Sequence, residues 1–428
     1  MMNRALAQCV VESLRVTGPF EELLVRLGTF SRRDWQQTLP WLDDSGLALY
    51  LFERLHQSGL RQALPVEIEA RLLGNLDSNR RRLAKMKEEF ASLNRRFEAA
   101  GVEYAVLKGF ALVPDYCPDA RLRSQYDYDY LVAEGSLAKA QQVLEAAGYS
   151  KKVQSPGFEK VGASLFAPQS LHLPASDEDF YSSGISRTVE LHLSLWEPNR
   201  DWIRLETPAG ALDRTTLATW EGLRFPVLAD EDALVLQALH AFQHTLDYWC
   251  RPSCFLEIAY FIARRHSDSA FWERFRSRLE GRRHLFEIVG LVFALAASLF
   301  KAPIPTEVRA WTTENLSAAL SLWVQRHGWN WALARFPGSK LSLLVHRQFV
   351  EDADLWKDVM LSRLIPIHRP ARVVESGNPT LSSRTLATWG QWRYVYSRVK
   401  FHVGGALGYA WELPRWKLVL RHLQRDHF

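Results

Sequence analysis

Two aspartates separated by one residue constrain this chain more than any other feature. They are Asp127 and Asp129, in the segment 126–132 (YDYDYLV), whose aromatic and β-branched residues predict a strand. Side chains at positions i and i+2 of a strand point to the same face. Two carboxylates side by side repel each other unless a cation lies between them. The segment therefore predicts a site for a hard cation, and the alternative is a solvated strand face carrying two unrelated acids.

The residues around this pair predict an α+β unit. The apolar run 102–107 predicts a strand that ends at Lys108-Gly109, and the spacing of 136–147 predicts a helix that closes at Gly148. A second alternating segment, 187–195, predicts another strand. In that strand Glu190 and His192 share one face, while Val189 and Leu191 share the other.

Five short motifs follow one another in a fixed order along the chain. They are Leu107-Lys108-Gly109, Arg123, the Asp127/Asp129 pair, the segment 188–193 (TVELHL), and the segment 236–244 (LQALHAFQH), which contains His240 and His244. This ordered set resembles the nucleotidyltransferase superfamily, and most closely a poorly characterised bacterial branch of it. The resemblance extends from about Pro40 to about Arg265, with a weaker match in the C-terminal tail. It implies a small mixed sheet with flanking helices, embedded in a mostly helical chain.

The resemblance also implies a reaction, namely transfer of a nucleoside monophosphate from a nucleoside triphosphate to an acceptor hydroxyl. Two Mg²⁺ ions are the expected cofactors, since Mg²⁺ is usually held by one or two carboxylates plus substrate phosphates. The implied catalytic and metal-binding residues are Asp127, Asp129 and Glu190. The implied substrate-binding residues are Lys108, Gly109, Arg123, His192, His240 and His244. The acceptor, a small molecule or a protein, is not indicated by the sequence.

The sequence departs from the superfamily pattern in two places. Lys108-Gly109 replaces a common Gly-Gly or Gly-Ser pair, and Tyr126 stands where a small residue is frequent. Together with Tyr128 and Tyr130, Tyr126 is expected to crowd the site with aromatic rings. Two other classes of function stay open: a glycosyltransferase that uses the Asp-x-Asp motif for its metal, and a non-catalytic nucleotide-binding protein. This chain lacks the series of alternating strands and helices that a glycosyltransferase of that class is expected to have before the motif.

Two histidines and two cysteines form a further group in the sequence. His240 and His244 lie four residues apart in a predicted helix over 231–247, so they share a helical face. They either contact substrate or a metal, or they are packed structural histidines. Cys250 and Cys254 lack the second pair of a zinc motif, which favours reduced thiols in a cytoplasmic protein, with a Cys/His metal site as the alternative.

The rest of the chain is predicted to be mostly helical. We expect a helical region over 1–100, a catalytic core over 101–228 and a second helical region over 229–428. Helices are predicted over 79–99, 255–265, 269–299 and 306–331, and the segment 201–227 is predicted to be mixed, with turns at Gly222 and Pro226.

Charge and hydropathy limit the classes of partner that the chain is expected to bind. The net charge of +5 suits an anionic substrate and predicts no tight binding to generic nucleic acid. The longest apolar run, 288–300, is too short to span a bilayer and predicts a buried helix. The N-terminus lacks the pattern of a signal peptide. Aromatic and basic residues gather after 384, where the tail either packs on the helical region or contacts a membrane surface or an anionic partner.

Overall fold

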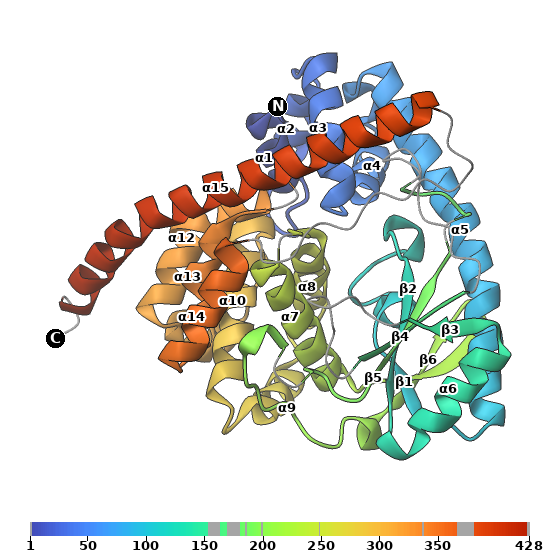
Figure 1. The fold of residues 1–428 in the computed structure, drawn as a ribbon. Coiled ribbons are helices and arrows are strands. Elements are labelled where there is room, and N and C mark those ends of the chain that lie inside the picture. Colours follow the sequence, from blue (N-terminus) through green and yellow to red (C-terminus); the bar gives the residue numbers. More distant parts are fainter. Residues whose placement is uncertain are drawn as a thin grey trace.

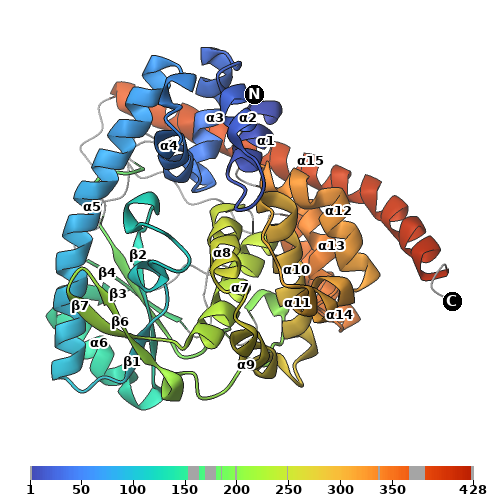
Figure 2. The ribbon, with the colours of Figure 1, turned by 180° about the vertical axis from the view of Figure 1, so that it is seen from behind.

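One seven-stranded mixed sheet lies in a chain that is 64% helical, so the predicted α+β class is confirmed. The computed structural model describes residues 2–152, 163–168, 180–184, 186–197, 200–247, 249–335, 338–365 and 381–425. The sheet with helix α5 forms one side of the molecule, and the C-terminal helices form the other (Figure 1). The view from behind shows the N-terminal helices bridging the two sides (Figure 2).

The first hundred residues are helical, as predicted. The helices are α1 (Arg4–Ser13), α2 (Glu21–Leu27), α3 (Arg32–Asp44), α4 (Ala48–Gln57) and α5 (Val66–Ala99). Helix α3 begins with a capping box, in which the side chain of Ser31 accepts from the Asp34 amide and the Asp34 carboxylate accepts from the Ser31 amide. Helix α5 is one 34-residue helix, and its stripe of Met86, Phe90 and Phe97 packs on the sheet.

The sheet contains every strand predicted from the sequence. The strands are β1 (Tyr104–Val106), β2 (Asp127–Val132), β3 (Tyr149–Lys151), β4 (Ala163–Pro168), β5 (Thr188–His192), β6 (Thr216–Trp220) and β7 (Leu223–Val227). Their spatial order is β3-β4-β5-β2-β1-β7-β6. Strand β2 is central, antiparallel to β1 and parallel to β5. Helix α6 (Leu137–Ala146) follows β2, and Gly148 after it has a φ of 86°.

Side-chain alternation divides the central strands between two cores. In β2, Tyr128 and Tyr130 point to the face covered by α5, where Phe90 contacts both rings. Asp127, Asp129 and Leu131 point to the opposite face, where Leu131 joins the core of the helical regions. The expectation that Tyr128 and Tyr130 crowd the site was therefore wrong, because their odd–even spacing from the aspartates places them across the sheet.

The segment 201–227 is more regular than its sequence pattern indicates. It forms the hairpin β6–β7, which turns at Gly222 with a φ of 82°. Pro226 does not mark a turn but lies inside β7, opposite Leu217. Strand β7 pairs with β1 at a single position, Val106 with Val227, so little of the sheet depends on the amide that proline lacks.

The helices after the sheet are α7 (Asp230–Leu246), α8 (Ser253–Arg264), α9 (Ser269–Leu279), α10 (Arg283–Phe300), α11 (Thr306–Trp311), α12 (Ala318–Ala332), α13 (Leu343–His346), α14 (Ala353–Leu364) and α15 (Leu381–Arg425). The helix predicted over 269–299 is interrupted at Gly281, whose φ is 76°. The helix predicted over 306–331 is interrupted between α11 and α12, where Thr312 has a φ of −112° and a ψ of −89°.

Short 3-10 turns connect these elements: η1 (Arg61–Ala63), η2 (Gly109–Leu112), η3 (Ala120–Leu122), η4 (Glu134–Ser136), η6 (Arg200–Trp202), η7 (Leu212–Arg214), η8 (Thr313–Asn315) and η9 (Lys340–Ser342). The sequence of 110–113 favours the start of a short helix, and the 3-10 turn η2 lies there. The sequence of 150–186, rich in Ser, Pro and Gly, predicts two irregular strands and a flexible loop over the site. Strands β3 and β4 lie in or at the start of this segment, and residues 153–162, 169–179 and 185, where the loop is predicted, are outside the described residues.

The N-terminal and C-terminal helices share one hydrophobic core. The amide of Val16 donates to the Phe300 carbonyl at 2.8 Å, and the indole of Trp41 donates to the Ala332 carbonyl at 3.3 Å. Helix α10 passes through this core, as predicted for an apolar buried helix. Among the described residues it is the one helix apolar and long enough to cross a membrane, and 61% of that apolar stretch is buried in the molecule.

The 45-residue helix α15 both packs on the body and presents apolar side chains to solvent. Its His402, Tyr409 and Trp416 are buried, whereas Trp392 and Trp411 are about two-thirds exposed, at 66% and 67%. The helix crosses the molecule and extends beyond it at the C-terminal end (Figure 1). The predicted packing of the tail is therefore confirmed for one face only.

Candidate functional site

The pairing of β2 with β5 brings the predicted carboxylates together. In this parallel ladder Asp129 is opposite Glu190, and Asp127 is opposite Thr188. Residues opposite each other in neighbouring strands point to the same face. Asp127, Asp129, Glu190 and His192 therefore gather on the sheet face that is turned away from α5.

Asp129 is the most enclosed member of this group, with 2% of its surface exposed. Its Oδ1 accepts from the ammonium of Lys108 at 2.9 Å and lies 3.1 Å from Nε2 of His192. Burial opposes ionisation of Asp129, but Lys108 and His192 hold the pKa of its carboxyl well below the usual range. Its Oδ2 is buried and has no hydrogen-bond donor. A buried carboxylate oxygen without a donor is costly, which points to a cation as the missing partner.

Lys108 and His192 compensate the buried acids. Burial lowers the pKa of Lys108, but the carboxylates of Asp129, Asp127 and Glu190 outweigh it and raise that pKa above its ordinary value. Burial likewise lowers the pKa of His192, and its hydrogen bonds to Asp129 and Glu197 reverse the effect. The carboxylates therefore favour the charged forms of both side chains, whose positive charge balances part of the negative charge on this face.

Glu197 is a member of the group that the sequence did not indicate. Its Oε1 lies 3.3 Å from Nδ1 of His192, whose Nε2 lies 3.6 Å from Glu190. Glu197 is 2% exposed, and its Oε2 has no partner. The imidazole of His192 is thus held between three carboxylates. Glu197 follows β5 in an irregular segment, so no periodicity marked it in advance.

These side chains line a cavity of about 260 Å³ between the sheet and helix α7 with the segment that follows it. Lys108, Asp127, Glu190, His192 and Glu197 form the wall on the sheet side. Helix α7 and the segment after it contribute His240, His244, Asp247 and Arg251, and Arg200 also lines the cavity. A hollow lined by carboxylates and by the cations Lys108, Arg200 and Arg251 is suited to hold a metal together with an anionic ligand.

Arg251 is a second residue that the sequence did not indicate. It lies between α7 and α8, and its guanidinium donates to the carbonyl of Ser124 at 2.9 Å and stacks 5.8 Å from the ring centre of Trp249. It is half-buried and lines the cavity. Its position comes from the α7–α8 turn folding back on the loop before β2, a contact between residues 127 positions apart.

Arg123 does not join this group. It is buried beside Glu257 of α8, with its Nε 3.1 Å from Oε1 of that carboxylate, which also accepts from Tyr50 at 3.1 Å. Burial lowers the pKa of Arg123, and Glu257 outweighs this effect, so the guanidinium is firmly charged. The resemblance implies phosphate binding by Arg123, and a structural ion pair with one of the aspartates is the alternative that the sequence leaves open. An ion pair exists, but its partner is Glu257.

Glycine is required at position 109 because of the backbone conformation there. Gly109 does not line the cavity. Its φ is 67°, and a Cβ at this position would lie 2.1 Å from Nε2 of Gln125. That amide donates to the carbonyl of Asp127 at 3.0 Å. Gly109 therefore lets Gln125 fix the start of β2, and it acts on the site through the position of Asp127.

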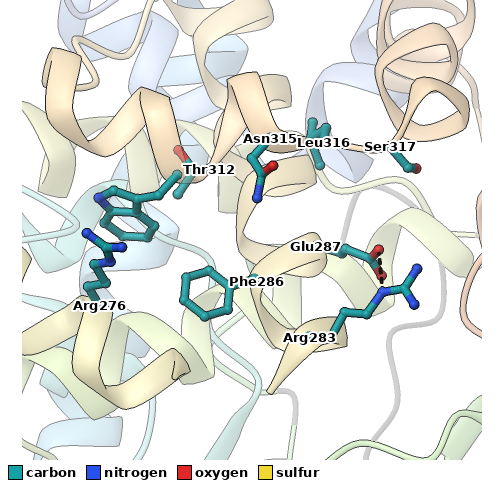
Figure 3. Close-up of a pocket in the computed structure, with 9 residues that line it drawn as sticks. Arg276, Arg283, Phe286, Glu287, Thr312, Asn315, Leu316 and Ser317 are labelled. Carbon is teal, nitrogen blue, oxygen red and sulfur yellow. Dashed lines mark hydrogen bonds and ion pairs between the residues drawn. The ribbon is translucent and has the colours of Figure 1, made fainter. Parts of the chain in front are cut away.

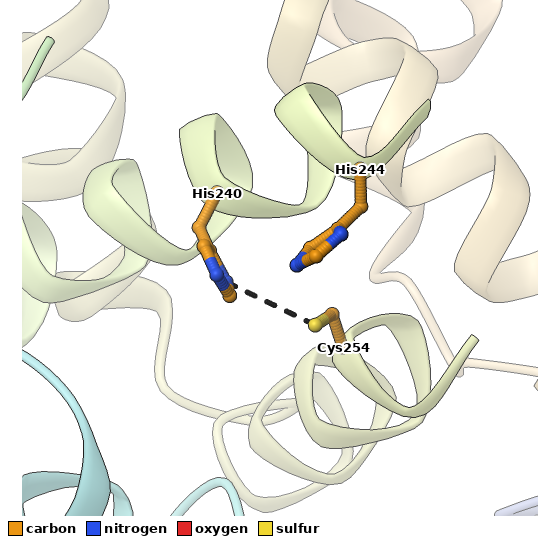
Figure 4. A group of neighbouring side chains, drawn as sticks. All are labelled: His240, His244 and Cys254. Atoms are coloured by element: carbon orange, nitrogen blue, oxygen red, sulfur yellow. Dashed lines mark hydrogen bonds between the residues drawn. The ribbon is translucent and has the colours of Figure 1, made fainter. Parts of the chain in front are cut away.

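His240 and His244 share one face of α7, as the helical spacing predicted, and in the structure both line the cavity. Their ring centres are 4.7 Å apart, and Nδ1 of His240 lies 3.8 Å from the thiol of Cys254 on α8 (Figure 4). Burial, together with the nearby Lys108 and Arg251, lowers the pKa of both imidazoles, to about 3 for His244. Both rings are therefore neutral at physiological pH.

The acidic group fits a divalent metal by its donor set. Asp129, Glu190 and His192 have ligand atoms within 4.8 Å of one another, and Asp127 lines the cavity together with Glu190 and His192. Carboxylate oxygens are the ligands that Mg²⁺ prefers, and the Oδ2 of Asp129 is free of protein donors. Two larger hollows, of about 440 and 490 Å³, contain none of the predicted site residues; Figure 3 shows the first, where Glu287 pairs with Arg283.

Comparison with known proteins identifies the family. No curated protein matches the chain. One similar solved structure is that of an antigenic nucleotidyltransferase-like protein from Paracoccidioides brasiliensis, with 16% identity over 51% of this chain and 93% of that one. Its TM-score of 0.27 is too low to support an inference. A family model described as uncharacterised nucleotidyltransferase matches residues 31–301, which is more than half of the chain. The resemblance seen in the motifs is confirmed, and the chain belongs to this family of uncharacterised nucleotidyltransferases.

Proposed function

We propose that the protein is a Mg²⁺-dependent nucleotidyltransferase that moves a nucleoside monophosphate from a nucleoside triphosphate to an acceptor hydroxyl. Membership of the family supports the reaction class. The observation that carries the proposal is the Asp129–Glu190 pair: Glu190 lines the cavity, and Asp129, buried beside it, has an oxygen that no protein donor satisfies. A cation and an anionic ligand together would complete this arrangement.

Asp127, Asp129 and Glu190 are the residues that would hold Mg²⁺, two ions in the proposal. When bound, the metal supplies positive charge that stabilises the developing charge on the phosphoryl oxygens. The proposed placement uses acids from two adjacent strands, which the sheet fixes rigidly. Sites on rigid elements hold their geometry better than sites on loops.

Cationic side chains on the cavity walls would bind the triphosphate. Lys108 donates one hydrogen bond to Asp129 at 2.9 Å, and an ammonium has two further donors for a phosphate oxygen. Arg251 and Arg200 face the same cavity, and a guanidinium can contact a phosphate with paired hydrogen bonds. The resemblance assigned this role to Arg123; its buried ion pair with Glu257 makes Arg251 the better candidate.

The proposed transfer exchanges one bond at the α-phosphorus. The acceptor oxygen forms a bond to that phosphorus, the bond from it to the β-phosphate oxygen breaks, and pyrophosphate leaves. The hydroxyl proton is accepted by the carboxylate of Glu190 and then passes to solvent. His192, held between Asp129, Glu190 and Glu197, keeps these acids in place and limits their mutual repulsion.

Pyrophosphate release and nucleotide binding test the proposal. Purified protein is incubated with each of the four ribonucleoside triphosphates and with nucleotide sugars, with Mg²⁺ or with chelator, and with fractionated cell extract as the source of acceptors. We expect a triphosphate to bind in the presence of Mg²⁺ and to release pyrophosphate with at least one fraction. The Asp127→Asn variant should release none, whereas Asp115→Asn, which removes an acid from a half-exposed pair with Arg264, should match wild type.

The two alternative classes give different results in the same assay. Release of a sugar from a nucleotide sugar, without turnover of triphosphates, would indicate a glycosyltransferase. Tight triphosphate binding without turnover in any fraction would indicate a non-catalytic nucleotide-binding protein. Absence of nucleotide binding with Mg²⁺ would contradict the proposal.

A further inference from the structure

A second cluster of metal-ligand side chains lies on the other wall of the cavity. It consists of His240 and His244 on α7 and Cys254 on α8, and one ligand atom of each lies within 4.8 Å of the others. Figure 4 shows the two rings turned towards the thiol from the facing helix. Tetrahedral Zn²⁺ has Zn–N distances of about 2.0–2.1 Å and Zn–S distances of about 2.3 Å, which places N and S about 3.5 Å apart. The observed 3.8 Å between His240 and Cys254 is close to that value.

The ring of His244 is oriented in the way that metal-binding histidines commonly are. Its Nδ1 lies 3.0 Å from the carbonyl of Trp249, and because a carbonyl only accepts, Nδ1 carries the proton. Nε2 is then the unprotonated nitrogen, with its lone pair available for a ligand bond. A backbone carbonyl that fixes the tautomer of the other ring nitrogen is a typical outer contact of a zinc-binding histidine.

Charge in this region both opposes and supports a metal. Lys108, Arg123 and Arg251 surround His240, and they disfavour a further cation. Arg123 is paired with Glu257, so its charge is largely offset. Burial and the nearby Glu257 raise the pKa of the Cys254 thiol to about 11. The imidazoles are neutral and ready to coordinate. The thiol would become a thiolate on binding, which cancels one of the two metal charges.

We propose that His240, His244 and Cys254 form a second metal site, selective for a thiophilic divalent ion such as Zn²⁺ and distinct from the all-carboxylate Mg²⁺ site. Sulfur and imidazole ligands select zinc over magnesium. On binding, the S–H bond of Cys254 is broken, a metal–sulfur bond forms and one proton is released to solvent, with no change of oxidation state. The site goes beyond the proposed nucleotidyl transfer and does not depend on it.

The fourth coordination position would face the cavity. His240 and His244 both line it, whereas Cys254 is buried behind them. Three protein ligands and one open position are typical of zinc sites that bind a water or a ligand oxygen. The chemical class of ligand expected there is an oxygen anion, such as a phosphate or carboxylate group of a molecule in the cavity.

Cobalt substitution tests the site with the full-length protein. Co²⁺ is titrated into chelator-stripped protein, and the thiolate-to-cobalt absorption band is recorded before Zn²⁺ is added to displace it. We expect one Co²⁺ per chain with a thiolate band that Zn²⁺ abolishes. Loss of an outer contact costs about 10–100-fold in metal affinity, so loss of a ligand in Cys254→Ser or His244→Gln should cost at least as much.

Two controls keep the result specific. Cys250→Ser removes a buried thiol four residues away that is outside the cluster, so the band should persist. Asp127→Asn should lose nucleotide turnover and keep the band, which separates this site from the proposed Mg²⁺ site. Absence of the band in wild type, or equal Co²⁺ affinity in wild type and a folded Cys254→Ser variant, would overturn the inference.

Discussion

Asp129 on β2 and Glu190 on β5 are opposite each other in a parallel ladder, so their carboxylates leave the sheet on the same face, 61 residues apart in the chain. His192 lies between them, with Nε2 3.1 Å from Asp129 and 3.6 Å from Glu190. This relationship explains why the two acids tolerate burial. It also distinguishes two kinds of variant. Some remove only a proposed metal ligand, and others remove in addition the negative partner of a buried cation.

The first prediction distinguishes the two aspartates. Asp127 is half-buried, and Asp127→Asn should abolish Mg²⁺-dependent turnover with little change in stability. Asp129→Asn should abolish turnover and also lower the free energy of unfolding by about 3–5 kcal/mol, because Lys108 and His192 lose a buried counter-charge. Urea unfolding and pyrophosphate release measure the two effects.

A double variant provides the control for Asp129. Lys108→Met combined with Asp129→Asn removes both charges of the pair and should recover part of the stability without recovering activity. Full turnover in either single aspartate variant would contradict the metal assignment. Equal stability of Asp127→Asn and Asp129→Asn would contradict the charge balance described for Lys108.

The second prediction concerns the two arginines. Arg123→Met leaves Glu257 buried without its cation, so the free energy of unfolding should fall by about 3–5 kcal/mol, and the double variant Arg123→Met/Glu257→Met should be more stable than either single one. Arg251→Met removes a charged donor from the cavity and should raise KM for the triphosphate about tenfold, since a hydrogen bond to a charged group contributes about 1.5–3 kcal/mol. If KM for the triphosphate is raised in the folded Arg123→Met/Glu257→Met variant and unchanged in Arg251→Met, then Arg123, and not Arg251, binds the phosphate.

The third prediction concerns Gly109. Alanine at this position adopts a left-handed φ at a cost of about 1–2 kcal/mol, and its Cβ also displaces the amide of Gln125. Gly109→Ala should therefore lower both stability and turnover. Gly109→Ala/Gln125→Ala should remove the steric clash between the new Cβ and the Gln125 amide, while the energetic cost of the left-handed φ remains. Thermal unfolding of the three proteins tests this, and a Gly109→Ala variant as stable as wild type would show that the backbone is unstrained.

The fourth prediction is a pH dependence of stability from a histidine outside the site. His346 is 1% exposed, its Nε2 lies 2.6 Å from the carbonyl of Asp201, and burial, with Arg363 nearby, lowers its pKa to about 4. The unfolded chain takes up a proton at about pH 6.5, and the folded chain does not until about pH 4. Stability from His346 is thus complete above about pH 6.5 and is lost as pH falls towards 4.

The variant His346→Gln keeps a donor for Asp201 and removes the titration. Between about pH 7.5 and about pH 5, wild type should lose about 2 kcal/mol more unfolding free energy than the variant, at 1.36 kcal/mol per pKa unit. His240 and His244 act in the same direction in both proteins, so the difference isolates His346. An identical decline in both proteins would contradict the assignment.

The fifth prediction concerns helix α15. Trp392, Tyr396, Val399, Val403, Leu407 and Trp411 are exposed and recur every three or four residues. Glu412 is the single acid between 381 and 425, against Arg384, Arg393, Arg398, Lys400, Arg415, Lys417, Arg421 and Arg425. An apolar stripe among basic residues favours an anionic membrane surface. We expect the protein to sediment with anionic vesicles and not with neutral ones.

Replacing Trp392 and Trp411 by serine should reduce this vesicle binding about tenfold or more, at about 1.5–3 kcal/mol for each buried large side chain. Leu217→Ser, which changes an equally exposed residue on the edge strand β6, is the matched control. Unchanged binding in the double variant would contradict the prediction.

Nucleic acid binding, by contrast, should be weak and confined to α15. Tight binding that falls steeply between about 50 and 200 mM salt, and that survives removal of the helix, would make nucleic acid a candidate acceptor.

The sequence alone determined the local elements and the faces on which their side chains lie. The alternation in 126–132 and 187–195 predicted that Asp127 and Asp129 share a face, as do Glu190 and His192, because strand geometry has a period of two. The spacing of His240 and His244 predicted a shared helical face in the same way. These predictions hold since each depends on residues a few positions apart.

Only the tertiary structure decided which of these faces meet. The pairing of β2 with β5, the ion pair of Arg123 with Glu257 across 134 residues, and the positions of Glu197 and Arg251 on the cavity wall depend on how the sheet and α7–α8 pack. The periodicity of a single segment carries no information about its distant partner. The carboxylate motif could therefore be found by inspection of the sequence, whereas the cavity cations Arg200 and Arg251, and Cys254 beside the two histidines, required the folded chain.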